Sequence, residues 1–173
     1  MSNVITNNTN AEPVRANRGG KYLTFALARE VYGLEILKVR EIIGLMEITN
    51  VPRTLPYVKG VINLRGQVIT VMDLRARFAM SPTERTDQTC IIVVETAQAG
   101  RKMNTGIIVD RVLEVLNIPA DTIEDPPACE DASGAGFILG MGKVGNSVRI
   151  LLNIDRVLHA DGPLNPVELL HAA

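Results

Sequence analysis

The sequence predicts an all-β protein built from two similar small units, and three observations lead to this prediction. Aromatic residues make up only 3% of the 173-residue chain and Trp is absent, so the core must consist of Val, Ile and Leu. Fourteen Gly and nine Pro residues punctuate short β-branched segments, a composition that favours strands and turns. Three of these segments recur in the same order, which indicates an internal repeat.

The repeat aligns blocks from the two halves of the chain. The aligned blocks are 22–28 with 90–96, 33–43 with 106–116, and 68–74 with 148–154, at offsets of 68, 73 and 80 residues. Each unit is expected to hold about five short strands, and small antiparallel sheets avoid open edges by curling into barrels. The polar segment 81–89 is the expected link, which divides the chain into units of approximately 21–80 and 90–158.

The first unit is expected to contain strands over 22–28, 32–36, 46–51, 61–64 and 68–72. Apolar spacings of three and four predict a short helix or helical turn over 37–43. Arg65-Gly66-Gln67 predicts a tight turn between the last two strands. Asp73 is a suitable N-cap for a short helix over 74–78, because its carboxylate can accept from free backbone amides.

The second unit is expected to contain strands over 90–96, 103–109, 137–142 and 148–152. Helical spacing predicts a short helix over 111–116, and Asn153 is expected to cap another that reaches about residue 158. The polar residues 1–20 predict a disordered tail, and 163–173 a C-terminal tail or short helix.

Charge and hydropathy exclude several classes of partner. The net charge of −1 provides no broad basic field, which argues against nucleic acid or an anionic membrane as the main partner. The N-terminus lacks the features of a secretory signal, and no apolar run approaches the roughly 18 residues of a membrane span. We therefore expect a soluble, cytoplasmic protein without direct membrane insertion.

Catalytic and cofactor motifs are weak. The segment Gly140 to Gly145 matches G-x-G-x-x-G, but an expected strand follows it where a dinucleotide site needs a helix. A glycine-rich turn is the favoured interpretation, and a nucleotide-binding enzyme is the alternative. His159 and His171 do not complete a zinc site or a catalytic triad. The sequence predicts no enzyme activity, no catalytic or metal-binding residue and no cofactor.

Glu41 and Arg65 are the charged residues with a possible binding role, and two interpretations of them stay open. They form an incidental surface ion pair worth less than about 1 kcal/mol, or they edge an apolar groove that receives a helix. The groove would be lined by Ile36, Val39 and Val112, and charged rims around apolar grooves are typical of helix binding.

Three blocks of the sequence resemble one protein family. Residues 32–42 (YGLEILKVREI), 58–66 (VKGVINLRG) and 71–75 (VMDLR) are similar to the CheW family of bacterial chemotaxis coupling proteins. The resemblance places a CheW-like domain over 21–162 and implies two SH3-like five-stranded β barrels packed together, with short helices.

The resemblance also implies a function. Such proteins are non-enzymatic adaptors that bind the cytoplasmic tip of methyl-accepting chemotaxis receptors and the regulatory domain of the histidine kinase CheA, beside membrane receptor arrays. Ring assembly with CheA or with further copies is a possible extension, and an adaptor of a non-motility chemosensory pathway is the alternative. The implied receptor-binding residues are Ile36, Val39, Glu41, Arg65 and Val112. The implied kinase-binding residues are Gly44, Ile48 and Gly60, and the effect of Gly60 is open to a structural explanation.

Overall fold

The computed structural model describes residues 18–126 and 136–159. The first half contains β1 (Gly20–Leu27), β2 (Glu30–Glu35), the 3-10 helix η1 (Ile36–Lys38), β3 (Val39–Gly44), β4 (Val58–Leu64), β5 (Gln67–Asp73) and α2 (Leu74–Arg77). The second half contains β6 (Cys90–Gln98), β7 (Arg101–Val109), β8 (Arg111–Ile118), η2 (Ala120–Thr122), β9 (Ile123–Glu124), β10 (Ile138–Val144), β11 (Ser147–Leu152) and α3 (Ile154–His159).

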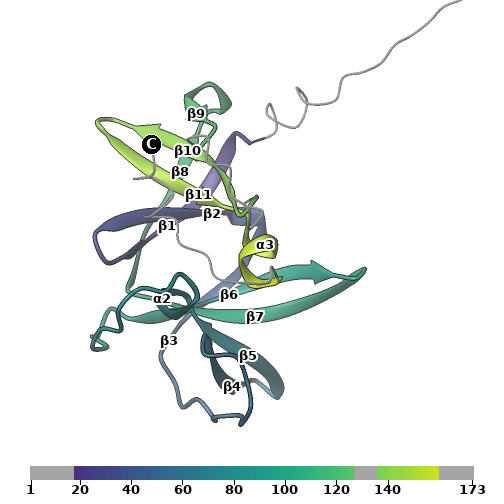
Figure 1. Ribbon diagram of the computed structural model, residues 1–173. Coiled ribbons are helices and arrows are strands. Elements are labelled where there is room, and N and C mark those ends of the chain that lie inside the picture. The colour runs from purple at the N-terminus through teal and green to yellow at the C-terminus, as the bar shows by residue number, and fades with distance from the viewer. Residues whose placement is uncertain (1–17, 127–135, 160–173) are drawn as a thin grey trace, which may run out of the picture.

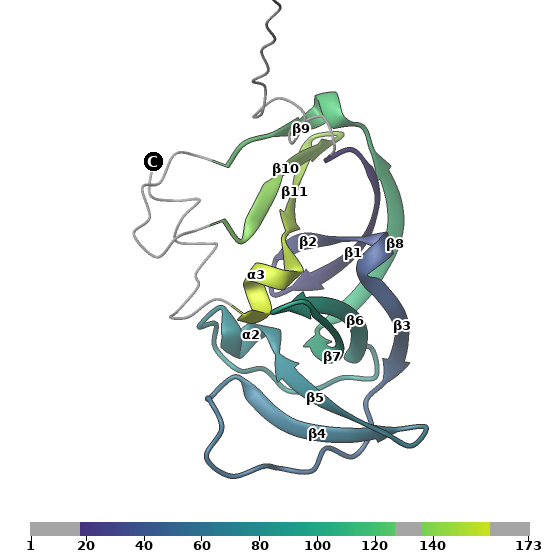
Figure 2. The same cartoon turned by 90° about the vertical axis from the view of Figure 1, so that its right-hand side faces the viewer.

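These strands form two curved sheets with two short helices between them (Figure 1, Figure 2). One sheet has six strands in the order β8-β1-β2-β11-β10-β9, and the other has five in the order β3-β6-β7-β5-β4. The β10–β11 hairpin lies at one end of the molecule and the β4–β5 hairpin at the other. The predicted fold class, mostly β with two small sheets and few short helices, is confirmed.

The internal repeat is visible in the topology. With β1 to β5 matched to β6, β7, β8, β10 and β11, the two sheets have the same strand order, apart from the additional β9 at the end of the six-stranded sheet. The two parallel contacts also correspond, since β5 pairs with β7 in one sheet and β11 pairs with β2 in the other. Helix α2 follows β5 just as α3 follows β11.

The sheets do not coincide with the two halves of the chain, which corrects the expected units of 21–80 and 90–158. Strands β1 and β2 pair with β8 and β11 of the second half in one sheet, whereas β3 pairs with β6 and β5 pairs with β7 in the other. The reason is the short connection after β2, where η1 redirects the chain so that β3 joins β6. The second repeat crosses in the same way between β7 and β8, so each sheet takes strands from both repeats.

The helices expected over 37–43 and 111–116 are wrong, because these segments form β3 and β8 beyond the single turn η1. Each strand contains a bulge: Arg40 is an extra residue in β3, and β8 has one extra residue between Val112 and Val115. An extra residue interrupts the period of two and produces apolar spacings like those of a helix. The strand expected over 46–51 is reduced to one bridge between Thr49 and Val61.

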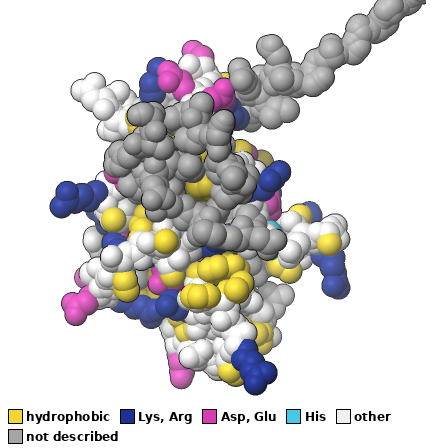
Figure 3. Space-filling model, viewed as in Figure 1, with side chains coloured by type: hydrophobic (Ala, Val, Ile, Leu, Met, Phe, Trp, Pro, Cys, Tyr) yellow, Lys and Arg dark blue, Asp and Glu magenta, His cyan; other side chains and the backbone are white. Residues whose placement is uncertain are grey.

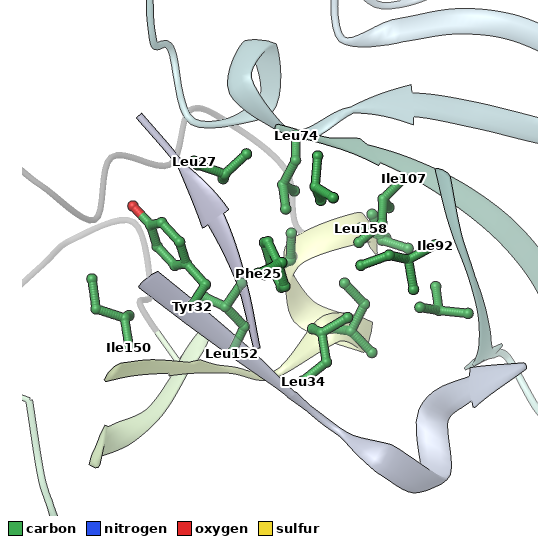
Figure 4. Close-up of a cluster of buried hydrophobic side chains, with 14 of the residues drawn as sticks. Phe25, Leu27, Tyr32, Leu34, Leu74, Ile92, Ile107, Ile150, Leu152 and Leu158 are labelled. Atoms are coloured by element: carbon green, nitrogen blue, oxygen red, sulfur yellow. The ribbon is translucent and has the colours of Figure 1, made fainter. Parts of the chain in front are cut away.

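The largest hydrophobic cluster lies between the two sheets and contains side chains from both (Figure 4). Strand β6 is buried on both faces, since Ile92 and Val94 belong to this central cluster while Ile91 and Val93 fill the interior of the five-stranded sheet. Burial on both faces explains why this segment is continuously apolar. The interleaved sheets therefore share one core.

A row of aromatic rings and an arginine link the parts of this core. Phe25, Tyr32, Phe78 and Phe137 follow one another with ring centroids 5.8 to 6.1 Å apart. The buried Arg77 on α2 donates from Nε to the carbonyl of Val157 on α3 at 2.8 Å. This hydrogen bond joins the helices of the two repeats.

The predicted turn and helix caps are present. Arg65 and Gly66 adopt φ values of 50° and 89° at the β4–β5 turn. Asp73 accepts a hydrogen bond from the Arg75 amide at 2.9 Å, and Asn153 accepts one from the Arg156 amide at 3.3 Å. Both helices in the described ranges are far too short to cross a bilayer. The expected tails lie outside the described residues, except for residues 18–20: Arg18 forms an ion pair with Asp125 at 2.9 Å and Gly20 begins β1.

Candidate functional site

Three of the implied receptor-binding residues gather at the edge of the central cluster. Ile36 in η1, Val39 on β3 and Val112 on β8 are all partly buried against it. In the strand ladders Val39 lies opposite Val94, and Val112 lies opposite Phe25. Directly paired residues point to the same face of a sheet, so both valines are on the faces that the two sheets turn toward each other.

Two exposed residues extend this apolar surface. Ile42 lies opposite Ile92 on β6, and Val115 lies opposite Leu23 on β1, so both also point to the inter-sheet faces. Ile42 is 45% exposed and Val115 is 48% exposed, although both are large aliphatic side chains. We name the surface formed by these four residues the aliphatic seam; its members are Val39, Ile42, Val112 and Val115.

The bulges of β3 and β8 create this arrangement. Without the extra residue, side chains three positions apart on a strand would point to opposite faces. In β8 the bulge is supported by the buried Thr24, whose hydroxyl donates to the Glu114 carbonyl at 2.7 Å and accepts from the Glu114 amide at 3.1 Å. The sequence interpretation missed Ile42 and Val115, although the repeat alignment pairs them with each other.

Glu41 and Arg65 form an ion pair, but on the opposite side of β3 from the seam. Glu41 lies opposite Val93, which belongs to the interior of the five-stranded sheet. Strands β3 and β4 are the two ends of that sheet, so the ion pair and the Thr49–Val61 bridge connect its edges. The Arg65 side chain is 68% exposed, and a pair this exposed contributes less than about 1 kcal/mol to folding.

The backbone of Arg65 is in an unusual conformation for a non-glycine residue. Its φ is 50°, and the equivalent position of the second repeat is Gly145 with φ 61°. The left-handed region costs a residue with a Cβ about 1 kcal/mol. An arginine that is strained and only weakly stabilising favours a role in binding rather than in folding.

Charged residues on the two seam strands differ in their partners. Near β3, Lys38 contacts Asp155 at 2.8 Å and Arg40 contacts Glu95, in addition to the pair of Glu41 with Arg65. On β8, Arg111 and Glu114 are exposed, and neither forms an ion pair with another residue of 18–126 or 136–159. Unsatisfied charge beside the seam is therefore concentrated on β8.

Two of the implied kinase-binding residues, Gly44 and Ile48, lie along the segment that leaves β3, and the third, Gly60, is on β4 against that segment. Gly44 ends β3 and is exposed, and a Cβ there would meet no atom within 4 Å. Ile48 is half-buried against the core of the five-stranded sheet. Gly60 has φ 141°, and a Cβ there would lie 2.0 Å from the Thr49 carbonyl oxygen. Any substitution of Gly60 therefore disturbs packing, whereas Gly44 presents open surface.

Two aspartates hold the connections between strands and helices. Asp110 accepts two hydrogen bonds of 2.8 Å from Arg75 on α2 and one of 2.8 Å from the Ala28 amide. Partial burial raises the pKa of Asp110, but these hydrogen bonds outweigh burial and hold the pKa below its usual value. We name this arrangement the Asp110 clamp.

The second clamp has the same form. Asp155 on α3 contacts the Lys38 ammonium at 2.8 Å and accepts from the Ala97 amide at 3.0 Å. Its pKa is likewise raised by burial and lowered, on balance, by the hydrogen bonds from Lys38 and Ala97 and by the charges of Lys38 and His159. We name this arrangement the Asp155 clamp.

The glycine motif of residues 140–145 is part of a hairpin, which contradicts the nucleotide-binding alternative. Gly140 and Gly142 are in β10, Gly145 is in the turn, and β11 follows. A Cβ on Gly140 would lie 2.5 Å from Ile123 Cγ2. The space beside the motif is thus filled by protein, and no helix follows to bind a phosphate. In the described part of the chain, His, Cys, Asp and Glu form no group of three suited to a metal ion.

The aromatic and basic residues of the described ranges do not form a nucleic-acid site. Five of the six aromatic residues are fully buried, and the sixth, Tyr57, is half-buried with the Arg77 guanidinium 4.5 Å from its ring centroid. Lys and Arg side chains are scattered over the face shown in Figure 3 rather than gathered into one patch. Stacking on single strands needs exposed aromatic rings, so the described surface favours protein partners.

Comparisons with known proteins agree with this geometry. The model of the CheW-like domain family matches residues 21–162. The chemotaxis protein CheW of Klebsiella aerogenes is 34% identical over 143 residues, which cover 83% of this chain and 84% of that protein. The chemotaxis protein CheW of Bacillus subtilis is 37% identical over 109 residues, covering 63% and 67% of the two chains.

A solved structure is similar as well. The crystal structure of the scaffolding protein TtCheW from Thermoanaerobacter tengcongensis superimposes with a TM-score of 0.72 at 35% identity. The match covers 83% of this chain and 95% of that one.

Proposed function

The chain belongs to the CheW-like domain family, and we propose that it is a non-enzymatic adaptor coupling methyl-accepting chemotaxis receptors to the histidine kinase CheA. In this proposal the protein works in the cytoplasm at membrane receptor arrays. Its role is to hold two other proteins together, which requires two separate binding surfaces on a stable scaffold.

The aliphatic seam is the proposed surface for the receptor. The observation that carries this assignment is the exposure of Ile42 and Val115 on the inter-sheet faces, beside the partly buried Val39 and Val112. An apolar strip of this kind fits the apolar face of a helix, and the receptor tip is helical in this proposal. Arg65 and Glu41 lie on the other side of the edge strand β3 and would contact polar residues of the receptor beyond the seam.

The end of β3 and the segment after it are the proposed surface for CheA. Gly44 and Ile48 border this segment, and Gly60 holds it against β4 by close packing. The seam uses Val39 and Ile42 on the inter-sheet face of β3, whereas Gly44 ends the strand and leads into the second surface. One strand would therefore connect both partners, and assembly into rings with CheA or with further copies of the chain is compatible with this geometry.

Reversal of the charge at Arg65 tests the receptor surface. We expect Arg65→Glu to weaken receptor pull-down, because it removes the cation beside the seam and repels Glu41. CheA binding and the melting temperature should stay unchanged, because the pair is exposed and weak. Arg101→Glu, at the exposed start of β7, is the matched control and should bind the receptor as the wild type does.

Two outcomes would contradict the assignment. If Arg65→Glu unfolds the protein in proportion to the loss of binding, the role of Arg65 is structural. If Arg101→Glu weakens binding equally, the effect comes from overall charge and not from this surface. The identities of receptors and kinase that co-purify with the chain from cells distinguish a swimming pathway from another chemosensory pathway.

A further inference from the structure

The two edge strands that carry the seam have equivalent glutamates with different surroundings. Glu41 on β3 and Glu114 on β8 are 73 residues apart, the offset that relates these two strands. Glu41 is neutralised by Arg65 at the β4–β5 turn. The equivalent turn position in the second repeat is Gly145, so the corresponding turn offers Glu114 no cation.

Glu114 is displayed from a rigid part of the backbone. Its amide and carbonyl both bond to the hydroxyl of Thr24, which is only 1% exposed. It precedes Val115, the exposed member of the seam on β8. Neighbouring residues of a strand point to opposite faces, so the Glu114 side chain leaves β8 on the face away from Val115, as Glu41 does on β3. Because β8 is the edge strand of its sheet, the exposed carboxylate is at the border of the seam, and it forms no ion pair with another described residue.

The seam itself is nearly symmetric, because Val39 and Ile42 are the repeat equivalents of Val112 and Val115. Such a surface could accept a helix in either of two opposite directions. The charge along its two borders is not symmetric: among the described residues Glu41 is paired with Arg65, whereas Glu114 and Arg111 on β8 form no ion pair. Complementary charge at the edge of an interface fixes orientation and selects partners more than it adds affinity.

We propose that the helix docked on the seam carries a basic residue that pairs with Glu114, and that this pair sets the direction in which the helix lies. The inference rests on the proposed function, because it identifies the chemistry of the receptor segment at the same surface. Ile42 and Val115 supply the apolar contacts on the two strands of the seam. The pair with Glu114 favours one direction of the docked helix over the opposite one.

The apolar part is tested with a matched pair of valines. Val115 and Val148 are 48% and 47% exposed, and both are in the six-stranded sheet, with β11 three strands away from β8. The probe is a purified soluble fragment containing the cytoplasmic tip of one receptor, and its dissociation constant is measured by calorimetry. We expect Val115→Ser to weaken binding about tenfold, and Val148→Ser to leave it unchanged.

The charged part is tested by reversal and compensation. We expect Glu114→Lys to weaken binding of the same fragment about tenfold at low salt, with a smaller effect at high salt. Each basic residue of the fragment is then changed to Glu in turn. One of these fragment variants should bind Glu114→Lys better than it binds the wild type. Glu30→Lys, at the exposed start of β2, should behave as the wild type.

The outcomes separate this inference from the function on which it rests. If the wild-type chain does not bind the receptor fragment at all, the proposed function fails. If the wild type binds and Glu114→Lys binds equally well, or no fragment variant compensates, the inference about Glu114 is overturned while the adaptor function stands. Unchanged melting temperatures for Val115→Ser and Glu114→Lys exclude unfolding as the cause.

Discussion

The two repeats of the chain have the same kinds of residue at equivalent helix caps and strand bulges. Asp73 and Asn153 cap equivalent helices. Gly60 and Gly140 are at equivalent bulges, where a Cβ would strike the segment that crosses to close the sheet. In the first repeat that segment is the bridge at Thr49, and in the second it is β9. Agreement between the repeats marks the positions that determine the fold.

The repeats differ at positions that carry charge. Arg65 occupies a turn position where the second repeat has Gly145. The helix residue of each clamp is also reversed in sign, since Arg75 on α2 has Asp155 as its equivalent on α3. A clamp with its charges reversed still joins a helix to the strands beside it. The change from Arg65 to Gly145, in contrast, leaves Glu41 with a cation and Glu114 without the equivalent one. The second difference is therefore the one that we connect with binding.

Substitution of the two equivalent glycines, Gly60 and Gly140, is expected to change the free energy of unfolding most. We expect Gly60→Ala to destabilise the protein by about 3 kcal/mol or more, because the new Cβ would lie 2.0 Å from a backbone oxygen in a left-handed conformation. Gly140→Ala should cost about 1–3 kcal/mol, because its closest contact is a side-chain methyl at 2.5 Å. Denaturation by urea measures both values.

Gly44→Ala is the control for these glycines, because a Cβ there meets open space. Its free energy of unfolding should equal that of the wild type within about 0.5 kcal/mol. A destabilised Gly44→Ala, or a Gly60→Ala of normal stability, would contradict the separation between surface and packing roles at this edge of the sheet.

The clamps give a smaller effect that depends on pH. We expect Asp110→Asn to cost about 1–2 kcal/mol at neutral pH, because it weakens two hydrogen bonds from Arg75. Asp155→Asn should cost less, because Lys38 supplies a single contact. The pKa of each aspartate is lowered by folding, so this stabilisation is complete above the unfolded value of about 3.9 and is lost as pH falls below it.

Urea denaturation of wild type and Asp110→Asn at several pH values measures this dependence. The difference between the two proteins should be constant near neutral pH and shrink as the pH falls through about 4 toward the lowered pKa of Asp110. A difference that persists unchanged at low pH would show that the carboxylate charge does not contribute.

The smallest effect on stability is expected from exchanging a residue between the repeats. Arg65→Gly places in the first turn the residue that the second repeat uses. Stability should rise or stay within about 1 kcal/mol, because relief of the left-handed strain offsets the loss of an exposed ion pair. Receptor binding should nevertheless weaken, as measured by calorimetry. A clear loss of stability would mean that Arg65 is retained for folding.

Much of the fold could be predicted from the sequence, because segments such as β6 are buried on both faces and remain apolar throughout. The order of the strands could not, since the crossing after β2 has no local sequence signal. The helices expected over 37–43 and 111–116 failed for a physical reason, because one extra residue in a strand gives the apolar spacing of a helix. Residue patterns of this kind cannot separate the two without the pairing partner.

The candidate site was predictable to a similar degree. Val39 and Val112 were identified and are together at the central cluster, and the pairing of Glu41 with Arg65 was one of the two interpretations left open. Ile42 and Val115 were missed, because only the bulge places them on the seam face. The binding roles of all these residues remain predictions.

Reconstitution of the ternary complex tests the central claim most directly. Membranes containing one receptor are mixed with CheA and with the chain, and the amount of kinase that sediments with the membranes is measured. We expect the wild-type chain to increase it strongly, and Arg65→Glu to fail while still binding CheA in solution. Sedimentation of the kinase to the same extent without the chain, or with Arg65→Glu, would contradict the account.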